Sequence, residues 1–199
     1  MYTVYGMAIS GNCYKLKLAL TQLDQPYRWV ELDILKGATK TPEFLALNPN
    51  GQVPTIVLPD GDTLVESNAI LCYLADGSPL WPSDRRTKAE VLKWMFFEQY
   101  SHEPNIATVR FWVAYAGRAQ ELAAEIEKRK VNGYKALKVM EETLAKRPFL
   151  AGDKYTIADI ALYAYTHVAH EGGYDLSAYP AVQAWLARVA AQPGYVGMN

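Results

Sequence analysis

The chain has 199 residues, of which 50% are hydrophobic and 21% charged, a composition typical of a packed globular protein. The formal net charge of -1 comes from 20 basic and 21 acidic residues, which excludes strong electrostatic steering towards nucleic acid or an anionic membrane surface. The first residues carry neither a basic stretch nor a long apolar stretch, so we expect no signal peptide. No stretch of the sequence approaches the ~20 uninterrupted apolar residues that a spanning helix needs, so we expect no membrane span.

The first 76 residues switch repeatedly between a period of two and a period of 3.6 residues, which predicts short strands alternating with amphipathic helices. Asp60-Gly61 between two apolar runs indicates a β-hairpin, and Ser67 is predicted to cap the helix after it. The predicted order is βαβαββα, with strands near residues 2–5, 30–34, 54–58 and 63–67 and helices near 16–23, 42–47 and 67–75.

Residues 77–87 (GSPLWPSDRRT) predict a linker, because two prolines and a glycine separate patterned segments. After the linker the strand pattern disappears, and helices are predicted near residues 88–116, 118–146, 157–171 and 179–192. Pro104 is expected to kink the first of these helices. Thr156 and Asp159 have the spacing of a capping box, which marks the start of a helix and implies no chemistry.

The two cysteines, Cys13 and Cys72, each fall within a predicted helix. We expect them to be reduced thiols of a cytoplasmic protein rather than a disulfide. His167 and His170 lie one helical turn apart, but too few further ligands lie near them for a metal site, so no metal is expected.

Two loop segments of the first half carry groups that suit an amino-acid ligand. Glu66 and Ser67 precede an apolar helix, where the hydroxyl and the first N–H groups can seat a carboxylate while Glu66 holds an amine. Taken alone, the pair is more often a plain helix cap. Val53-Pro54 begins a strand, and a cis bond there would leave the Val53 backbone able to pair with an extended peptide. A simple turn is the alternative for this dipeptide.

The order of SGN, TKTPEF, NPNGQVPTI and DGDTLVESNAI, with FLAGDKYTIADI in the second half, resembles the glutathione S-transferase family across essentially the whole chain. The resemblance implies a thioredoxin-like domain at 1–76, a linker at 77–87 and an all-helical domain at 88–199. It also implies that glutathione is the co-substrate. Glu66 and Ser67 would then hold the γ-glutamyl end, Val53, followed by Pro54, the cysteinyl backbone, and Lys40 and Gln52 the glycyl carboxylate.

The family activates the glutathione sulfur with a residue at the end of the first strand, and the matching position here is Ser10, as in serine-type members of theta-, phi- or nu-like classes. Asn12 is a second candidate donor to the sulfur, and a helix cap is its alternative role. Tyr5 is a rival to Ser10, although a core aromatic fits its spacing better. Cys13 is expected to pack within the helix, because Ser10 stands where a CxxC motif would place its first cysteine.

Three functions follow from the resemblance. The first is conjugation of glutathione to small hydrophobic electrophiles, as in detoxification; the second is reduction of disulfides or peroxides; the third is a non-catalytic binding or scaffold protein. The family also implies a homodimer. The electrophile pocket is expected to be lined by Met7, Ile9, Tyr100, Ile106 and Arg110, although helix packing would give the last three the same spacing.

Overall fold

The computed structural model describes residues 1–198, which form two compact units. The first unit comprises residues 1–81 together with the C-terminal segment from Pro193, and the second comprises residues 82–192. The sequence assigned the C-terminal segment to the helical domain. In the structure this segment packs on the first helix instead, where Tyr14 Oη and Lys17 Nζ donate hydrogen bonds to the carbonyl oxygens of Val196 and Met198, at 2.8 Å and 3.1 Å.

The first unit contains the βαβαββα order that the sequence predicts. Its elements are β1 (Tyr2–Gly6), α1 (Gly11–Gln22), β2 (Tyr27–Glu31), α2 (Pro42–Leu47), β3 (Thr55–Val57), β4 (Thr63–Val65) and α3 (Ser67–Ala75). The sheet order is β2-β1-β3-β4, with β1 and β2 parallel and the other two pairs antiparallel. The second strand ends at Glu31, three residues before the predicted end, because Ile34–Lys36 form a 3₁₀ turn capped by Asp33.

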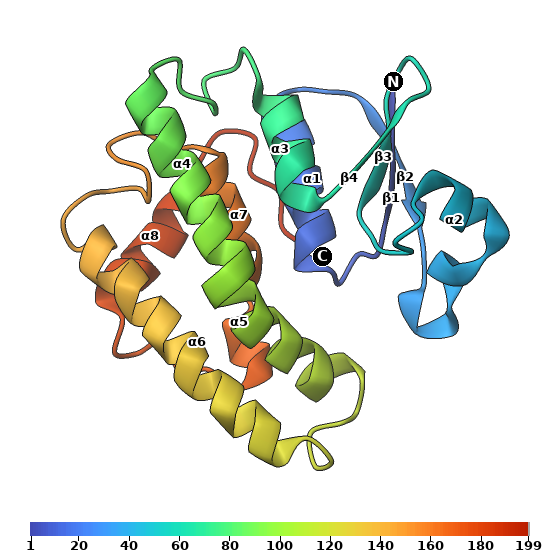
Figure 1. The fold of residues 1–199 in the computed structure, drawn as a ribbon. Helices are drawn as coiled ribbons and strands as arrows, with labels where there is room; N and C mark the ends of the chain where they lie inside the picture. The colour runs from blue at the N-terminus through green and yellow to red at the C-terminus, as the bar shows by residue number, and fades with distance from the viewer. Residues whose placement is uncertain (199) are drawn as a thin grey trace. The chain divides into compact units, whose positions relative to one another are not determined.

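Helices α1 and α3 lie side by side on one face of this sheet, and α2 lies on the other (Figure 1). The alternation of side chains along a strand explains the two layers. Val4 and Ile56 face the α1–α3 layer and join the buried core of this unit with Leu16, Leu20 and Ile70. The next residue along β1, Tyr5, points to the opposite face, where its ring meets that of Phe44 in α2 edge to face at 6.1 Å.

The second unit is helical, as predicted. Its elements are α4 (Arg85–Phe97), α5 (Glu103–Arg110), α6 (Ala123–Leu144), α7 (Ile157–Thr166), α8 (Pro180–Ala190) and a short 3₁₀ helix at Ala169–Gly172. All ten residues of α7 are buried, which makes it the central helix of this unit. The capping box at its start is present, with Thr156 and Asp159 exchanging side-chain and backbone hydrogen bonds.

The predicted helix at 88–116 differs from the structure in two ways. It begins earlier, at Arg85, within the predicted linker. It is also divided by two π-helical segments, Glu98–His102 and Phe111–Tyr115, which the helical period of the sequence did not reveal. Pro104 lies in the first turn of α5, directly after the first π segment, where its missing N–H is tolerated.

None of the helices formed by residues 1–198 has the length and apolar content that a membrane span requires.

Candidate functional site

The loop between β1 and α1 is held by hydrogen bonds to the neighbouring strand. The Glu31 side chain accepts from the Ala8 N–H at 2.9 Å and from the Trp29 indole N–H at 2.6 Å. Trp29 also packs on Gly6, where a Cβ atom would lie only 2.7 Å from the indole ring. The loop therefore delivers Ser10 to the start of α1 in a defined position.

Ser10 is the N-cap of α1, with its hydroxyl oxygen accepting from the Cys13 N–H at 3.4 Å. This corrects the alternative reading of Asn12 as the cap. Capping uses a lone pair of the hydroxyl, whereas an interaction with a thiolate uses its proton. The two roles of Ser10 are therefore compatible.

Cys13 has no exposed surface, and the Met7 N–H donates to its sulfur at 3.4 Å. Burial raises the pKa of the Cys13 thiol to about 11, against a smaller lowering effect of a hydrogen bond from Ser10. A protonated, buried thiol is a poor nucleophile, so Cys13 is a packing residue in this structure.

The first turns of α1 and α3 are joined by a hydrogen bond in which the Ser67 hydroxyl donates to Asn12 Oδ1 at 3.1 Å. Because Ser67 donates to the amide oxygen of Asn12, the other end of that amide is its NH2 group, which can donate. Candidate residues that are 55 positions apart in the chain thus meet at one place.

Glu66 and Ser67 occupy different environments at the start of α3. Glu66, not Ser67, is the N-cap, and its φ of +67° is unusual for a residue other than glycine. The Glu66 side chain is exposed, whereas Ser67 is 6% exposed. Backbone strain of this kind is frequently found at ligand sites.

The loop before β3 is organised by Asn48, which is buried. Its amide group donates to the Gln52 carbonyl oxygen at 2.8 Å and to Thr55 Oγ1 at 3.2 Å. The Val53–Pro54 peptide bond is cis, as expected. Val53 lies two residues before Thr55, the first residue of β3, so its backbone lies outside the strand ladder.

Lys40 and Gln52 approach each other through Gly51. Lys40 Nζ donates to the Gly51 carbonyl oxygen at 3.1 Å, and the Gln52 side chain accepts from Asn50 Nδ2 at 3.3 Å. Gly51 has a φ of +62°, and a Cβ atom there would lie 2.9 Å from the Thr39 carbonyl oxygen. Only glycine fits this turn without strain, and the turn places the two polar side chains in adjacent loops.

Of the residues expected to line an electrophile pocket, Met7 is 8% exposed and Ile9 is partly exposed. Ile106 has no exposed surface, so it is a core residue of the helical unit rather than a pocket wall. Tyr100 is 88% exposed and lines a groove of about 310 Å³ that also includes Asn132 and Val139 of α6.

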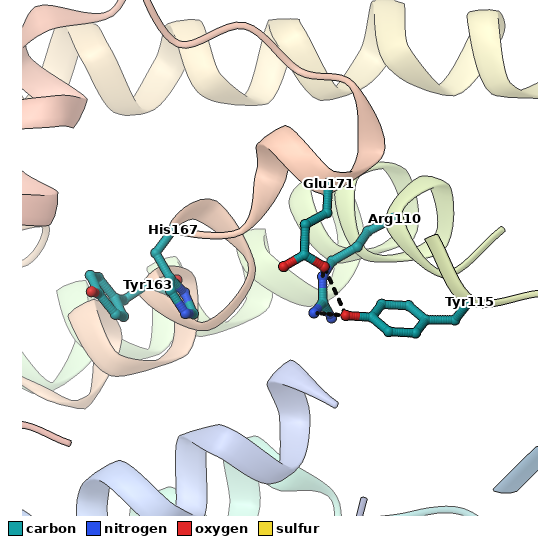
Figure 2. Close-up of polar contacts among 5 residues, drawn as sticks. All are labelled: Arg110, Tyr115, Tyr163, His167 and Glu171. Atoms are coloured by element: carbon teal, nitrogen blue, oxygen red, sulfur yellow. Dashed lines mark hydrogen bonds and ion pairs between the residues drawn. The ribbon is translucent and has the colours of Figure 1, made fainter. Parts of the chain in front are cut away.

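Arg110 is 3% exposed and forms part of a polar cluster within the helical unit (Figure 2). Its guanidinium donates to Glu171 Oε2 at 2.9 Å and to the Tyr115 hydroxyl at 2.8 Å, and Tyr115 itself donates to Glu171. The π-helical turn brings Tyr115, five residues further on, back to Arg110. Arg110 therefore serves a structural ion pair in this structure.

Figure 2 also shows the His167 ring stacked on Tyr163, with ring centroids 4.6 Å apart. His167 Nδ1 lies 2.7 Å from the Tyr163 carbonyl oxygen. Residues 1–198 contain no group of three or more side chains placed to hold a metal ion.

Sequence reasoning did not identify Lys15, Asn48 or Glu31. Lys15 is spaced three and four residues from Leu18 and Ala19, which places it on the apolar side of α1, and this spacing was a usable signal. The Asn-Pro-Asn run around Asn48 has the composition of a turn in which asparagine bonds the backbone two residues on, and the Asn50 N–H does donate to Asn48 Oδ1.

Comparison with known proteins agrees with this geometry. The profile described as "Glutathione S-transferase, N-terminal domain" matches residues 9–76, and "Glutathione S-transferase, C-terminal domain" matches residues 103–193. The chain is 35% identical to Glutathione S-transferase 3 of Zea mays, over 96% of this chain and 90% of that protein. It is 33% identical to Disulfide-bond oxidoreductase YfcG of Escherichia coli, over 94% of this chain and 89% of that protein.

Solved structures give the same result. A glutathione S-transferase structure from Pseudomonas fluorescens is 57% identical with a TM-score of 0.97, covering 99% of this chain and 98% of that one. A structure of Ure2p in complex with glutathione is 27% identical with a TM-score of 0.87, covering 97% and 90%. Both halves of the chain and its whole length thus agree with one assignment: the protein belongs to the glutathione S-transferase family.

Proposed function

We propose that this protein is a glutathione transferase, which binds glutathione and activates its thiol for attack on small hydrophobic electrophiles. The observation that carries the proposal is the exposed Glu66 carboxylate beside the buried Ser67 hydroxyl at the N-terminus of α3. A carboxylate that attracts an ammonium group and a hydroxyl that donates to a carboxylate together match the α-amino acid end of a γ-glutamyl group.

The rest of glutathione would extend along the loop before β3. Val53 lies outside the strand ladder, so its backbone would pair with the cysteinyl residue as an added strand does. Lys40, which has three N–H donors, and Gln52 would receive the glycyl carboxylate.

Ser10 would stabilise the thiolate by donating its hydroxyl proton to the sulfur, with the positive end of α1 adding to the effect. A free thiol has a pKa of about 8.5 and is mostly protonated at neutral pH. Lowering that pKa by about two units corresponds to about 2.7 kcal/mol of preference for the thiolate. The thiolate of glutathione is then the nucleophile, and no protein nucleophile is required.

Reduction of disulfides with glutathione is the second candidate function. It is favoured by Asn12, whose amide is held beside the start of α3, and by the 33% identity to a protein named as a disulfide-bond oxidoreductase. A panel containing an aryl halide, a peroxide and a small disulfide separates the two activities. Glutathione binding without turnover of any of them would identify a non-catalytic binding protein.

We also propose that the protein is a two-fold homodimer. Support comes from large apolar side chains that remain exposed on the helical unit, namely Phe96 at 70% and Tyr100 at 88%, with Val139 at 44% lining the same groove as Tyr100. Contiguous exposed apolar surface, as opposed to a single exposed side chain, commonly marks a protein interface.

Calorimetric titration with glutathione tests the binding assignment. Replacing Glu66 by Gln and Ser67 by Ala together should weaken binding at least tenfold, because a hydrogen bond to a charged group contributes about 1.5–3 kcal/mol. Asp24→Asn is the matched control, since Asp24 is also an exposed acidic residue with positive φ. Equal affinity of the wild type and the double variant would sink the assignment.

A further inference from the structure

Lys15 is a lysine with no exposed surface in the middle of the first unit. Its ammonium group donates to Ser67 Oγ and to Asn68 Oδ1, both at 3.2 Å. These are the first two residues of α3, so Lys15 reaches from α1 to the helix start where the γ-glutamyl group is proposed to bind. Lysine is almost never fully buried without such partners.

The contact with Lys15 determines the direction of the Ser67 hydroxyl proton. An ammonium group can only donate, so Ser67 Oγ must accept from Lys15. A hydroxyl has a single proton, and Ser67 directs that proton away from Lys15, onto Asn12 Oδ1 at 3.1 Å. Lys15 thus keeps Ser67 as a donor on the side opposite to the ammonium group.

The contact also adds charge. The Lys15 ammonium group contacts the first turn of α3 through the Ser67 hydroxyl. The backbone N–H groups of that turn already attract an anion, so the ammonium group adds positive charge to the same place. A buried ion has a high cost in desolvation, and an apolar side chain of similar size would pack this position at a lower cost. The position of the charge therefore points to a task at the Ser67 hydroxyl rather than to packing.

We propose that Lys15 is a positioning residue for the α-carboxylate of the γ-glutamyl group. It acts through Ser67, by fixing the hydroxyl as a donor and by supplying positive charge behind it. The inference rests on the proposed function, since it requires that a γ-glutamyl carboxylate binds at the start of α3. On binding, the Ser67 hydroxyl keeps its proton and redirects its hydrogen bond from Asn12 Oδ1 to the carboxylate.

The test compares two ligands, glutathione and an analogue in which 4-aminobutyryl replaces γ-glutamyl. The analogue keeps the amine and lacks only the carboxylate. The wild type should bind glutathione at least tenfold more tightly than the analogue. Lys15→Met should reduce this ratio about five- to tenfold, and it should raise the KM for glutathione with little effect on kcat at saturation.

Lys17→Met is the matched control, because Lys17 lies on the same helix and donates to the backbone carbonyl of Met198. It should leave the ratio of the two affinities unchanged. A Lys15→Met variant that weakens both ligands equally would show that Lys15 is only structural, and the proposal would be wrong.

Ser67→Ala gives a second route if Lys15→Met does not fold, since it removes the hydroxyl through which Lys15 acts. This variant must also reduce the ratio, and a ratio equal to that of the wild type overturns the proposal. Failure of the wild type to bind glutathione at all would overturn the proposed function itself. By contrast, tight glutathione binding by the wild type with an affinity ratio unchanged in Lys15→Met would overturn only the role of Lys15.

Discussion

At the scale of single residues, the hydroxyl of Ser10 has two roles, one structural and one proposed. Its oxygen caps α1 and its proton is proposed to stabilise the thiolate of glutathione. Cys13 and Tyr5 are the neighbouring groups that could be mistaken for it. The first is buried with a raised pKa, and the second packs its ring on Phe44.

Replacing Ser10 by Ala should raise the apparent pKa of bound glutathione by about one to two units, because the thiolate loses a hydrogen-bond donor. The acid limb of the conjugation rate should move to higher pH, while glutathione affinity changes much less. Thiolate absorbance measured against pH checks this. Loss of the cap should also lower the free energy of unfolding by about 1 kcal/mol, a separate effect that denaturation measures.

Cys13→Ser and Tyr5→Phe are the controls, and both should leave the thiol pKa unchanged. A raised pKa in Tyr5→Phe but not in Ser10→Ala would transfer the role to Tyr5. No rise in either variant would leave Asn12 and the N-terminus of α1 as the activating groups and would favour disulfide reduction.

At the scale of elements, the start of α7 depends on Asp159, whose side chain has no exposed surface. Its carboxylate accepts from the Leu150 N–H, the Thr156 N–H and the Trp185 indole N–H at 2.9–3.0 Å. Burial nevertheless raises the pKa of the Asp159 carboxyl to about 6, against the lowering effect of these bonds.

A raised pKa means that the folded state binds a proton more readily than the unfolded state between about pH 4 and 6. The contribution of Asp159 to the free energy of unfolding should therefore rise as pH falls through this window, by at most about 1.4 kcal/mol per pH unit. Asp159→Asn cannot titrate. The free energy of unfolding of the wild type minus that of Asp159→Asn, measured by urea unfolding, should be more positive at pH 4.5 than at pH 7. A smaller difference at pH 4.5 would show that the hydrogen bonds outweigh burial.

At the scale of the whole molecule, the proposed homodimer predicts a change in mass on a single substitution. Tyr100→Glu places a charge on the exposed apolar surface of the helical unit and should shift the protein towards a monomer of 22.3 kDa. Ala184→Glu, on the exposed side of α8, adds the same charge elsewhere and should leave the dimer intact. Sedimentation velocity at micromolar concentration distinguishes the two. A wild type that sediments only as a monomer would contradict the proposal.

The sequence alone determined the features that depend on neighbours in the chain. The strand and helix order of the first unit, the hairpin of β3 and β4 and the capping box of α7 are set by short-range periodicity and by turn and cap residues. Motifs such as NPNGQVP and ESNAI also placed the candidate site, because each is a short continuous segment.

The tertiary structure decided what depends on residues far apart. The bond between Ser67 and Asn12 and the burial of Lys15 beneath α3 join positions more than 50 residues apart, and the C-terminal segment packs on α1 across about 180 residues. The two π-helical segments cannot be recognised in the helical pattern of the sequence. An inserted residue widens one helical turn but leaves the amino-acid composition of the segment that of a helix. Local pattern reports which face of an element is apolar. Which partner a polar side chain such as Lys15 meets depends on tertiary packing, because that partner belongs to another element of the fold.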